Sequence, residues 1–201
     1  MTFGQRLIRV ITNLVVRWPW LWPVFRPIVR RQFDRMAPVW EGISQEDTLA
    51  PYEAALDRIP GPVRDALDVG TGTGAGARVL RARFGDASIT GTDVSPAMLE
   101  QARKHVPELT FVQGDAADLP FDDGSFDLVA HANMIPFLDE VARVLRPGGW
   151  TVFAFSSGPD TPIWVEPATL LRGLERRGFS DFAEIAAGRG KAVVARRAQS
   201  H

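Results

Sequence analysis

Hydrophobic positions in the first third of this 201-residue chain repeat with the period of an α-helix. Within residues 5–18 the arginines and Asn13 share one narrow arc of the helix, and the large apolar side chains lie opposite, at Leu7, Ile11, Leu14, Val15 and Trp18. Arginines interrupt the apolar runs well before the ~18 residues that a membrane-spanning helix needs. The pattern therefore predicts an amphipathic surface helix, neither a membrane span nor a secretory signal.

The segment that follows, 17–27, reads RWPWLWPVFRP. Pro19, Pro23 and Pro27 are expected to stop any regular helix there, because proline lacks the backbone N–H. A second helical stretch is predicted over about 28–42. The three tryptophans of the segment have two open roles: interface anchors or the roof of a pocket.

After Pro60-Gly61-Pro62 the pattern changes to short apolar runs that alternate with helical stretches. Strands are predicted at 66–69, 88–92, 109–112, 126–130 and 150–155, with helices from about 75, from Ser95, up to Leu145, and over about 167–177. Such alternation predicts an α/β fold with a mostly parallel, Rossmann-like sheet and helices on both faces. A closing pair, about 179–186 and 191–196, has a link too short for a crossover, so the last strand should run antiparallel. We divide the chain into a helical segment, 1–60, and a ligand-binding domain, 61–201.

Charge is distributed unevenly along the chain. The net charge is −1, but the first 35 residues hold seven arginines against Asp34 alone, a balance of +6 that leaves −7 for the rest. A basic, tryptophan-rich front on an acidic body argues against general nucleic-acid binding and favours a local anionic partner such as a phospholipid surface. The chain has no cysteine, which rules out disulfides and thiolate chemistry and agrees with a cytoplasmic protein.

The stretch ALDVGTGTGAG (66–76) combines a strand end, a glycine-rich turn and a helix start. Such a turn lets a ligand approach the backbone at the helix N-terminus. By itself it also satisfies the loose dinucleotide pattern. Asp68 argues for a different ligand, because its carboxylate would repel a pyrophosphate and suit an ammonium and a sulfonium.

Two further acidic residues end predicted strands. Asp93 can accept hydrogen bonds from both hydroxyls of a ribose, since Ser95 is available to cap the next helix. Asp115, in GDAADLPFDDGSFDLV (114–129), is placed for its side chain or the N–H of Ala116 to contact an adenine edge.

Together the stretches LDVGTGTG, GTDVSPAML, GDAADLPFDDGSFDLV and LRPGG resemble the class I S-adenosylmethionine-dependent methyltransferases. The similarity covers about 33–197 and points to the small-molecule branch that includes ubiquinone/menaquinone and phospholipid N-methyltransferases. It implies a seven-stranded sheet with S-adenosylmethionine as cofactor and S-adenosylhomocysteine as product. It also implies the cofactor-binding set Asp68, Gly70, Thr71, Gly72, Gly74, Asp93, Val94, Asp115 and Ala116.

The stretch FDRMAPVW (33–40) resembles the lid that precedes the domain in that family. The family usually has a tyrosine where this chain has Phe33, so either Arg35 or a water would have to replace its hydroxyl. Phe33 and Trp40 are equally well explained as lid residues or as plain packing.

Methyl transfer is a direct displacement, which needs alignment and exclusion of water, and a base only when the acceptor must lose a proton. His131, expected just past the fourth strand, is the candidate base, with a hydrogen-bonded lining residue as the alternative. Asn133 is a weaker polar candidate on the substrate side. No cluster of residues suggests a metal, and HANMIPF (131–137) lacks the motif of nucleic-acid adenine methyltransferases.

The sequence therefore predicts methyl transfer to a hydrophobic or membrane-associated small molecule, such as a lipid headgroup, a quinone-like ring or a natural product. Residues 1–28 could make peripheral contact with the inner face of a membrane. Two alternatives stay open: a soluble acceptor with the N-terminal segment as lid or dimer interface, and a protein that binds the cofactor without methyl transfer. The acceptor atom and the oligomeric state do not follow from the sequence.

Overall fold

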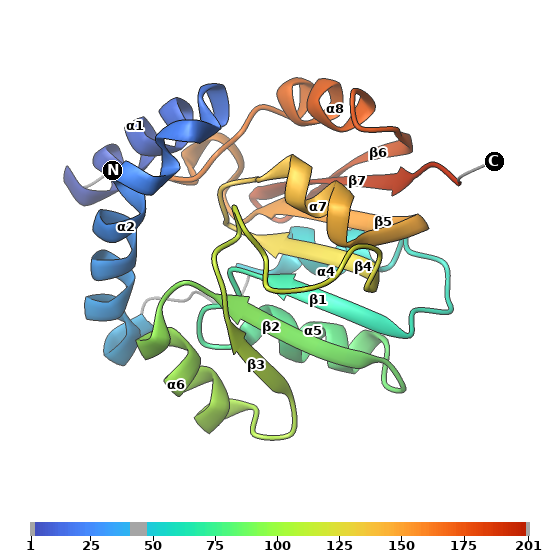
Figure 1. Cartoon of the computed structure of the whole chain (residues 1–201), viewed down its shortest axis with the longest axis horizontal. Coiled ribbons are helices and arrows are strands. Elements are labelled where there is room, and N and C mark those ends of the chain that lie inside the picture. The colour runs from blue at the N-terminus through green and yellow to red at the C-terminus, as the bar shows by residue number, and fades with distance from the viewer. Residues whose placement is uncertain (1–2, 41–47, 200–201) are drawn as a thin grey trace.

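The computed structural model describes residues 3–40 and 48–199 and contains one seven-stranded sheet in the order β3-β2-β1-β4-β5-β7-β6 (Figure 1). The strands are β1 (Asp65–Val69), β2 (Ser88–Asp93), β3 (Thr110–Gln113), β4 (Phe126–Ala132), β5 (Leu145–Phe155), β6 (Phe179–Ala187) and β7 (Gly190–Arg197). β7 pairs antiparallel with β5 and β6, and the pairs among β1 to β5 are parallel. The predicted fold class is confirmed.

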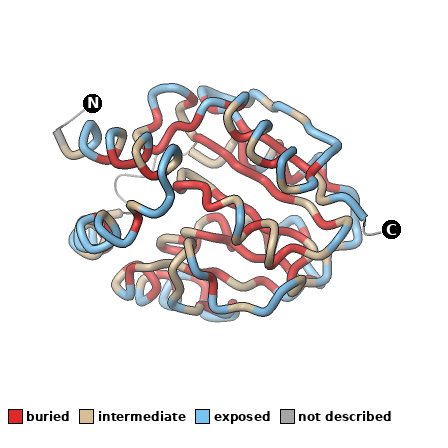
Figure 2. Tube along the Cα trace, turned by 45° about the horizontal axis from the view of Figure 1, so that its top comes forward, coloured by how far each residue is buried: buried red, intermediate tan, exposed pale blue. Residues whose placement is uncertain are grey.

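Helices cover both faces of this sheet. One face packs against α4 (Ala50–Leu56), α5 (Ala75–Arg83) and α6 (Pro96–His105), and the other against α7 (Leu138–Val144) and α8 (Pro167–Glu175). The central strands β1, β4, β5 and β7 are the most deeply buried part of the chain (Figure 2). Tyr52, Leu56 and Ile59 belong to the core of the first face, so residues 50–59 pack with the sheet, although we had grouped them with the N-terminal segment.

The prediction that the prolines stop any helix is wrong for Pro23 and Pro27, whereas α1 (Phe3–Arg17) does end before Pro19. α1 is followed by a 3-10 turn, η1 (Pro19–Leu21), and then by α2 (Trp22–Met36), which runs through Pro27; a second turn, η2 (Ala37–Val39), follows. Pro23 lies in the first turn of α2, where no intrahelical partner is required. Pro27 removes one hydrogen bond inside the helix, and the buried side chains of Trp22 and Val29 hold the helix in place on either side of it.

The buried face of α1 also differs from the expected one. Ile8, Ile11 and Val15 are buried, whereas Leu7 and Trp18 are exposed. The helix therefore has two apolar stripes, of which only one faces the protein. The buried stripe joins residues of α2 and of the segments 134–137 and 163 in a third apolar cluster, which we call the N-terminal core.

Other boundaries shift by a few residues. β4 extends to Ala132, so His131 lies inside the strand and not just past it, and β5 begins at Leu145, so RPGG is already extended. Residues 41 and 42 of the second predicted helical stretch lie outside the described residues. None of the described helices has the length and apolar character to cross a membrane.

Candidate active site

The order of the strands reverses between β1 and β4, since the chain proceeds from β1 to β2 and β3 on one side and from β4 to β5 on the other. In open α/β sheets, ligands bind beyond the carboxyl ends of the strands at such a point. The glycine-rich turn follows β1 there, Asp93 ends β2, Asp115 follows β3, and His131 lies near the end of β4. Tertiary structure thus brings the residues predicted from separate motifs to one edge of the sheet.

The glycine-rich turn has the backbone that its sequence predicts. Gly70, Gly72 and Gly74 have φ angles of 70°, 54° and 91°. Residues with a Cβ rarely adopt such positive φ angles, whereas glycine adopts them readily. The N–H groups of Gly70 and Thr71 donate to the carbonyl oxygen of Thr92, at 2.8 and 3.0 Å, which ties the turn to β2. A Cβ at Gly72 would meet only Trp40 Nε1 at 3.9 Å, so the backbone of the turn is open to a ligand under that indole.

Asp68 lies beneath this turn, and its carboxylate already has protein donors. It accepts hydrogen bonds from the Tyr52 hydroxyl (3.1 Å) and from Thr71 Oγ1 (2.7 Å). Burial raises the pKa of Asp68 to about 6, and the hydrogen bonds from Thr71 and Tyr52 partly offset that increase. A Cβ at Gly76 would lie 2.7 Å from the carboxylate, so that residue, too, must be glycine for α5 to begin so close. Asp68 thus holds the turn in place through Thr71 and allows only glycine at position 76.

Asp93 connects the turn to the start of α6. Its Oδ2 accepts from the N–H of Gly72 (3.0 Å), and its Oδ1 accepts from the N–H of Ser95 (2.8 Å). Burial raises its pKa to about 6, and these hydrogen bonds oppose the increase. Ser95 caps α6 with its own side chain, which accepts from Met98 N–H at 3.1 Å, as the sequence predicts.

Asp115 is held by the N-terminal segment, which the sequence did not reveal. Trp22 Nε1 donates to Oδ1 at 2.7 Å, and the Arg26 guanidinium pairs with Oδ2 at 2.9 Å. The N–H of Ala117 also donates to Oδ1, at 2.9 Å. Ala116, half-buried, packs against the N-terminal core. α2 is therefore attached to the loop that is expected to contact adenine.

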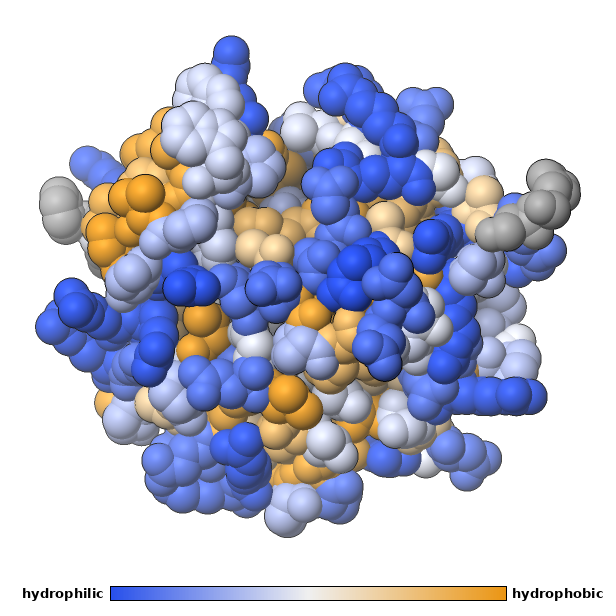
Figure 3. Space-filling model, in the orientation of Figure 1, coloured by the Kyte–Doolittle hydropathy of each residue, from blue (hydrophilic) through white to orange (hydrophobic). Residues whose placement is uncertain are grey.

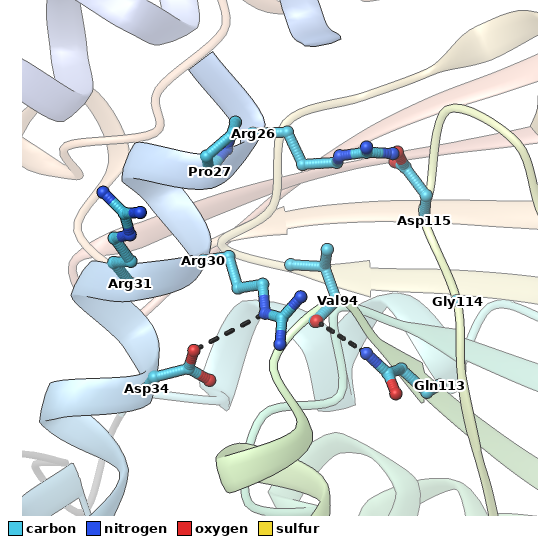
Figure 4. Close-up of a pocket in the computed structure, with 9 residues that line it drawn as sticks. All are labelled: Arg26, Pro27, Arg30, Arg31, Asp34, Val94, Gln113, Gly114 and Asp115. Atoms are coloured by element: carbon cyan, nitrogen blue, oxygen red, sulfur yellow. Dashed lines mark hydrogen bonds and ion pairs between the residues drawn. The ribbon is translucent and has the colours of Figure 1, made fainter. Parts of the chain in front are cut away.

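A cavity of about 730 Å³ opens between α2 and the ends of β2 and β3 (Figure 4). Its walls come from α2 on one side and from the strand ends on the other: Arg26, Pro27, Arg30, Arg31, Asp34, Val94, Gln113, Gly114 and Asp115. Val94 presents an apolar wall directly after Asp93, and Asp115 stands opposite. This combination fits the adenosine half of S-adenosylmethionine, and the open backbone of the glycine turn fits the methionine half.

Trp40, one of the two residues predicted as lid or as plain packing, lies over the turn. Phe33 and Trp40 make an edge-to-face contact with ring centroids 5.7 Å apart, and the Trp40 indole faces Gly72. Asp34, between them and α6, accepts a hydrogen bond from Ser95 Oγ at 2.6 Å. Arg35 is exposed, so the geometry brings Phe33 and Trp40 to the site and leaves Arg35 outside it.

His131 is buried and stacks on Phe153, with ring centroids 4.3 Å apart. Its Nδ1 lies 3.1 Å from the Val152 carbonyl oxygen, a contact that requires a proton on Nδ1 and leaves the lone pair on Nε2. Burial lowers the pKa of His131 to about 4, so the ring is neutral at pH 7.

Asn133 joins two strand ends through its side chain. It adopts a left-handed backbone with φ 53°, and its Oδ1 accepts from the N–H of Ser156 at 2.9 Å, which joins the ends of β4 and β5. Its neighbour Met134 lies directly on the glycine turn, where a Cβ at Gly70 would meet Met134 Cγ at 2.3 Å. In the described part of the chain, no three His, Asp or Glu side chains are grouped as metal ligands would be.

Sequence reasoning did not find Tyr52, Trp22, Arg26 or Asp34 as parts of this site. Tyr52 is the one tyrosine of the chain, which could have signalled a specific role for its hydroxyl. The contacts of α2 carry no local signal, because they join residues 61 to 93 positions apart.

Residues 66–149 match a family model described as "Methyltransferase domain". The matched residues include the glycine turn, Asp93, Asp115 and His131. With the sheet order above, this match confirms the resemblance predicted from the sequence. Residues 66–149 thus match a methyltransferase domain, on a sheet with the strand order that the resemblance to the class I, S-adenosylmethionine-dependent enzymes implies.

Individual relatives agree on that class. A phthiotriol/phenolphthiotriol dimycocerosates methyltransferase of Mycobacterium tuberculosis is 38% identical over 139 residues, 63% of this chain and 51% of the relative. A fatty-acid O-methyltransferase of Mycolicibacterium smegmatis is 35% identical over 147 residues, 66% and 54% of the two chains. The chain thus spans about half the length of these curated relatives.

A solved structure with the same fold comes from the complex of the Haloferax volcanii Trm112 methyltransferase activator with a methyltransferase. Its TM-score is 0.72 at 26% identity, and the alignment covers 86% of this chain and 99% of that one. The two proteins therefore share one fold over 86% of this chain.

Proposed function

We propose that this chain transfers the methyl group of S-adenosylmethionine to a hydrophobic, lipid-like small molecule. The observation that carries the proposal is the apolar N-terminal core beside the glycine turn. There Ile135, Phe137 and Ile163 meet residues of α1 and α2, and Met134 reaches Gly70. An acceptor that reaches the turn beside Met134 would meet an apolar side chain that is backed by this core.

The relatives support the same class of acceptor. The two bacterial enzymes are named for dimycocerosates and for fatty acids, and a fatty acid is a long hydrocarbon with one polar end. Hydrocarbon of this kind is stabilised by contact with aliphatic and aromatic side chains, at about 25 cal/mol per Å² of apolar surface removed from water.

The bound cofactor supplies an electrophilic methyl group on a sulfonium. In the proposal, the glycine turn binds its methionine part, Asp93 accepts hydrogen bonds from the ribose, and Val94, Asp115 and Ala116 bind the adenine. Asp68 acts through the turn, because its carboxylate is already held by Tyr52 and Thr71. Phe33 and Trp40 exclude water from above.

His131 is the proposed base for an acceptor that must lose a proton, with Nε2 as the accepting atom. Because its pKa is about 4, the ring is unprotonated near neutral pH but weakly basic, so it would suit an acceptor that loses its proton easily. Asn133 is proposed to position the loop after β4, since its side chain is bound to Ser156.

The test is incubation of the enzyme with deuteromethyl-labelled S-adenosylmethionine and a fractionated cell extract, followed by mass spectrometry. The expected result is a label on molecules of the organic-soluble fraction. Asp93→Asn serves as the control, because it removes the charge that holds Gly72 and Ser95 and should abolish labelling. A label confined to water-soluble molecules, or no label with cofactor bound, would contradict the proposal.

We also propose a cytoplasmic enzyme whose residues 1–28 make peripheral contact with the inner face of a membrane. The basic balance of the first 35 residues supports that contact.

A further inference from the structure

Large apolar side chains are exposed almost entirely on one part of the molecule. Of eight such residues in the described chain, seven lie between Leu7 and Val39, and the eighth is Phe182 on β6. Trp20 is 73% exposed, Val24 66% and Val10 54%. Hydrophobic side chains gather over α1 in Figure 3. Apolar groups concentrated in this way mark a contact surface, because scattered exposure would spread them over all elements.

The exposed residues follow the helical repeat. Leu7, Val10 and Trp18 are spaced by three and eight residues and lie on the side of α1 and at its end, next to the buried stripe. Val24 and Ile28 are four residues apart on α2 and form one outward stripe. Trp20 lies in η1, the corner that joins the two helices. The stripes therefore meet at that corner.

Arginines surround the same surface. Arg6 and Arg17 border the stripe of α1, and Arg31 and Arg35 continue the outward side of α2 beyond Ile28, at seven and eleven residues from Val24. All four are exposed, and none forms an ion pair with another residue in the ranges that the structure covers. Arg17 lies over the Trp18 ring, 5.0 Å from its centroid. We call these apolar and basic residues together the outer surface.

The tryptophans thus divide between two roles. Trp22 is buried, contacts Phe137 with ring centroids 5.2 Å apart and donates to Asp115. Trp18 and Trp20 point away from the protein. α2 consequently has one side on the cofactor edge of the sheet and another side in the outer surface.

We propose that the outer surface docks on an anionic phospholipid bilayer, with Trp18, Trp20, Val24 and Ile28 at the level of the acyl-chain boundary and the arginines at the headgroups. Tryptophan and arginine with aliphatic residues on the exposed sides of helices is the composition of interfacial helices. A second copy of the chain fits less well, because a two-fold dimer would bring the same unpaired arginines together. The inference rests on the proposed lipid-like acceptor for its purpose, since docking places the cofactor edge beside the lipid phase.

The experiment is sedimentation of the full chain with vesicles of phosphatidylcholine, with and without phosphatidylglycerol. The double variant Trp20→Ser, Val24→Ser is expected to lower the partition coefficient at least about tenfold, since each apolar side chain contributes about 1.5–3 kcal/mol on burial. Phe182→Ser is the matched control, because it removes an exposed apolar side chain from outside the outer surface. It should bind vesicles as the unmodified chain does.

The charge is tested separately. Arg6→Gln with Arg35→Gln should weaken binding about tenfold or more to vesicles that contain phosphatidylglycerol and leave binding to phosphatidylcholine unchanged. Equal partitioning of the Trp20, Val24 variant and the unmodified chain would overturn the inference. So would absence of vesicle binding together with a concentration-dependent dimer that this variant abolishes. Since sedimentation needs no turnover, vesicle binding without labelled lipid would contradict the proposed function alone.

Discussion

His131 illustrates how burial changes the chemistry of one residue. An exposed histidine would titrate near neutral pH, but this ring is stacked on Phe153 and bound to a carbonyl in the sheet, with a pKa of about 4. The folded protein therefore holds fewer protons at this site than the unfolded chain between about pH 4 and 6.5. Stability from this group is lost as the pH falls through that interval, because protons then favour the unfolded state.

His131→Gln should remove this part of the pH dependence. Between pH 7 and 4 the unmodified chain is expected to lose about 3 kcal/mol of unfolding free energy relative to the variant, at 1.36 kcal/mol per pKa unit. Urea denaturation at a series of pH values measures the difference. Asp68 and Asp93, with raised pKa values, act in the opposite direction in both proteins and cancel in the comparison. Parallel curves for the two proteins would show that burial does not depress the pKa of His131.

At the scale of one element, α2 depends on few contacts. Trp22 and Val29 are its buried residues, and Trp22, Arg26 and Asp34 attach it to the loops after β3 and β2. An isolated helix of 15 residues that contains a proline would be marginal in water. Its stability therefore comes from the side that packs on the sheet edge.

Substitutions at Trp22 should separate packing from hydrogen bonding. Trp22→Phe keeps the contact with Phe137 and loses the donor to Asp115, at an expected cost of about 1 kcal/mol. Trp22→Ala also opens a cavity, and we expect a loss of about 3–5 kcal/mol. Chemical denaturation checks both values. Trp20→Ala is the control, since its exposed ring predicts a change within about 0.5 kcal/mol. Similar losses at positions 20 and 22 would contradict the division of roles.

At the scale of the whole molecule, the sheet order places the glycine turn, Asp93 and Asp115 at one edge, with the N-terminal helix α2 beside them (Figure 1). The same strand ends in a dinucleotide-binding fold would receive a pyrophosphate. Here the carboxyl group of Asp68 lies beneath the turn and disfavours that ligand, whereas Asp93 ends β2, where an acid can bind the ribose of either cofactor.

Ligand-induced stabilisation should distinguish the two cofactors. S-adenosylhomocysteine at about 100 times its Kd is expected to stabilise the fold by about 2.7 kcal/mol, which for a chain of this size raises Tm by about 5–10 °C. NAD at the same concentration should leave Tm unchanged. A thermal denaturation scan measures both. A larger shift with NAD would contradict the assignment of the cofactor.

The sequence by itself determined the sheet and the cofactor edge. Strand ends, glycine positions and helix caps such as Ser95 depend on residues that are neighbours in the chain, so their patterns can be recognised locally. The same is true of Gly70, Gly72 and Gly74, whose positive φ angles follow from a turn of fixed length. The positions of Asp93 and Asp115 at strand ends were predicted for this reason, whereas their ligand contacts stay predictions.

Only the tertiary structure decided how the N-terminal segment is used. The helical pattern predicted an apolar side for α1 but not which of two stripes is buried, and the prolines indicated a break where α2 is continuous. Both outcomes depend on packing against residues more than a hundred positions away, such as Phe137 and Ile163. In RWPWLWPVFRP, burial and an indole hydrogen bond place Trp22 at the site and leave Trp18 and Trp20 outside, because the partner Asp115 is supplied by the fold.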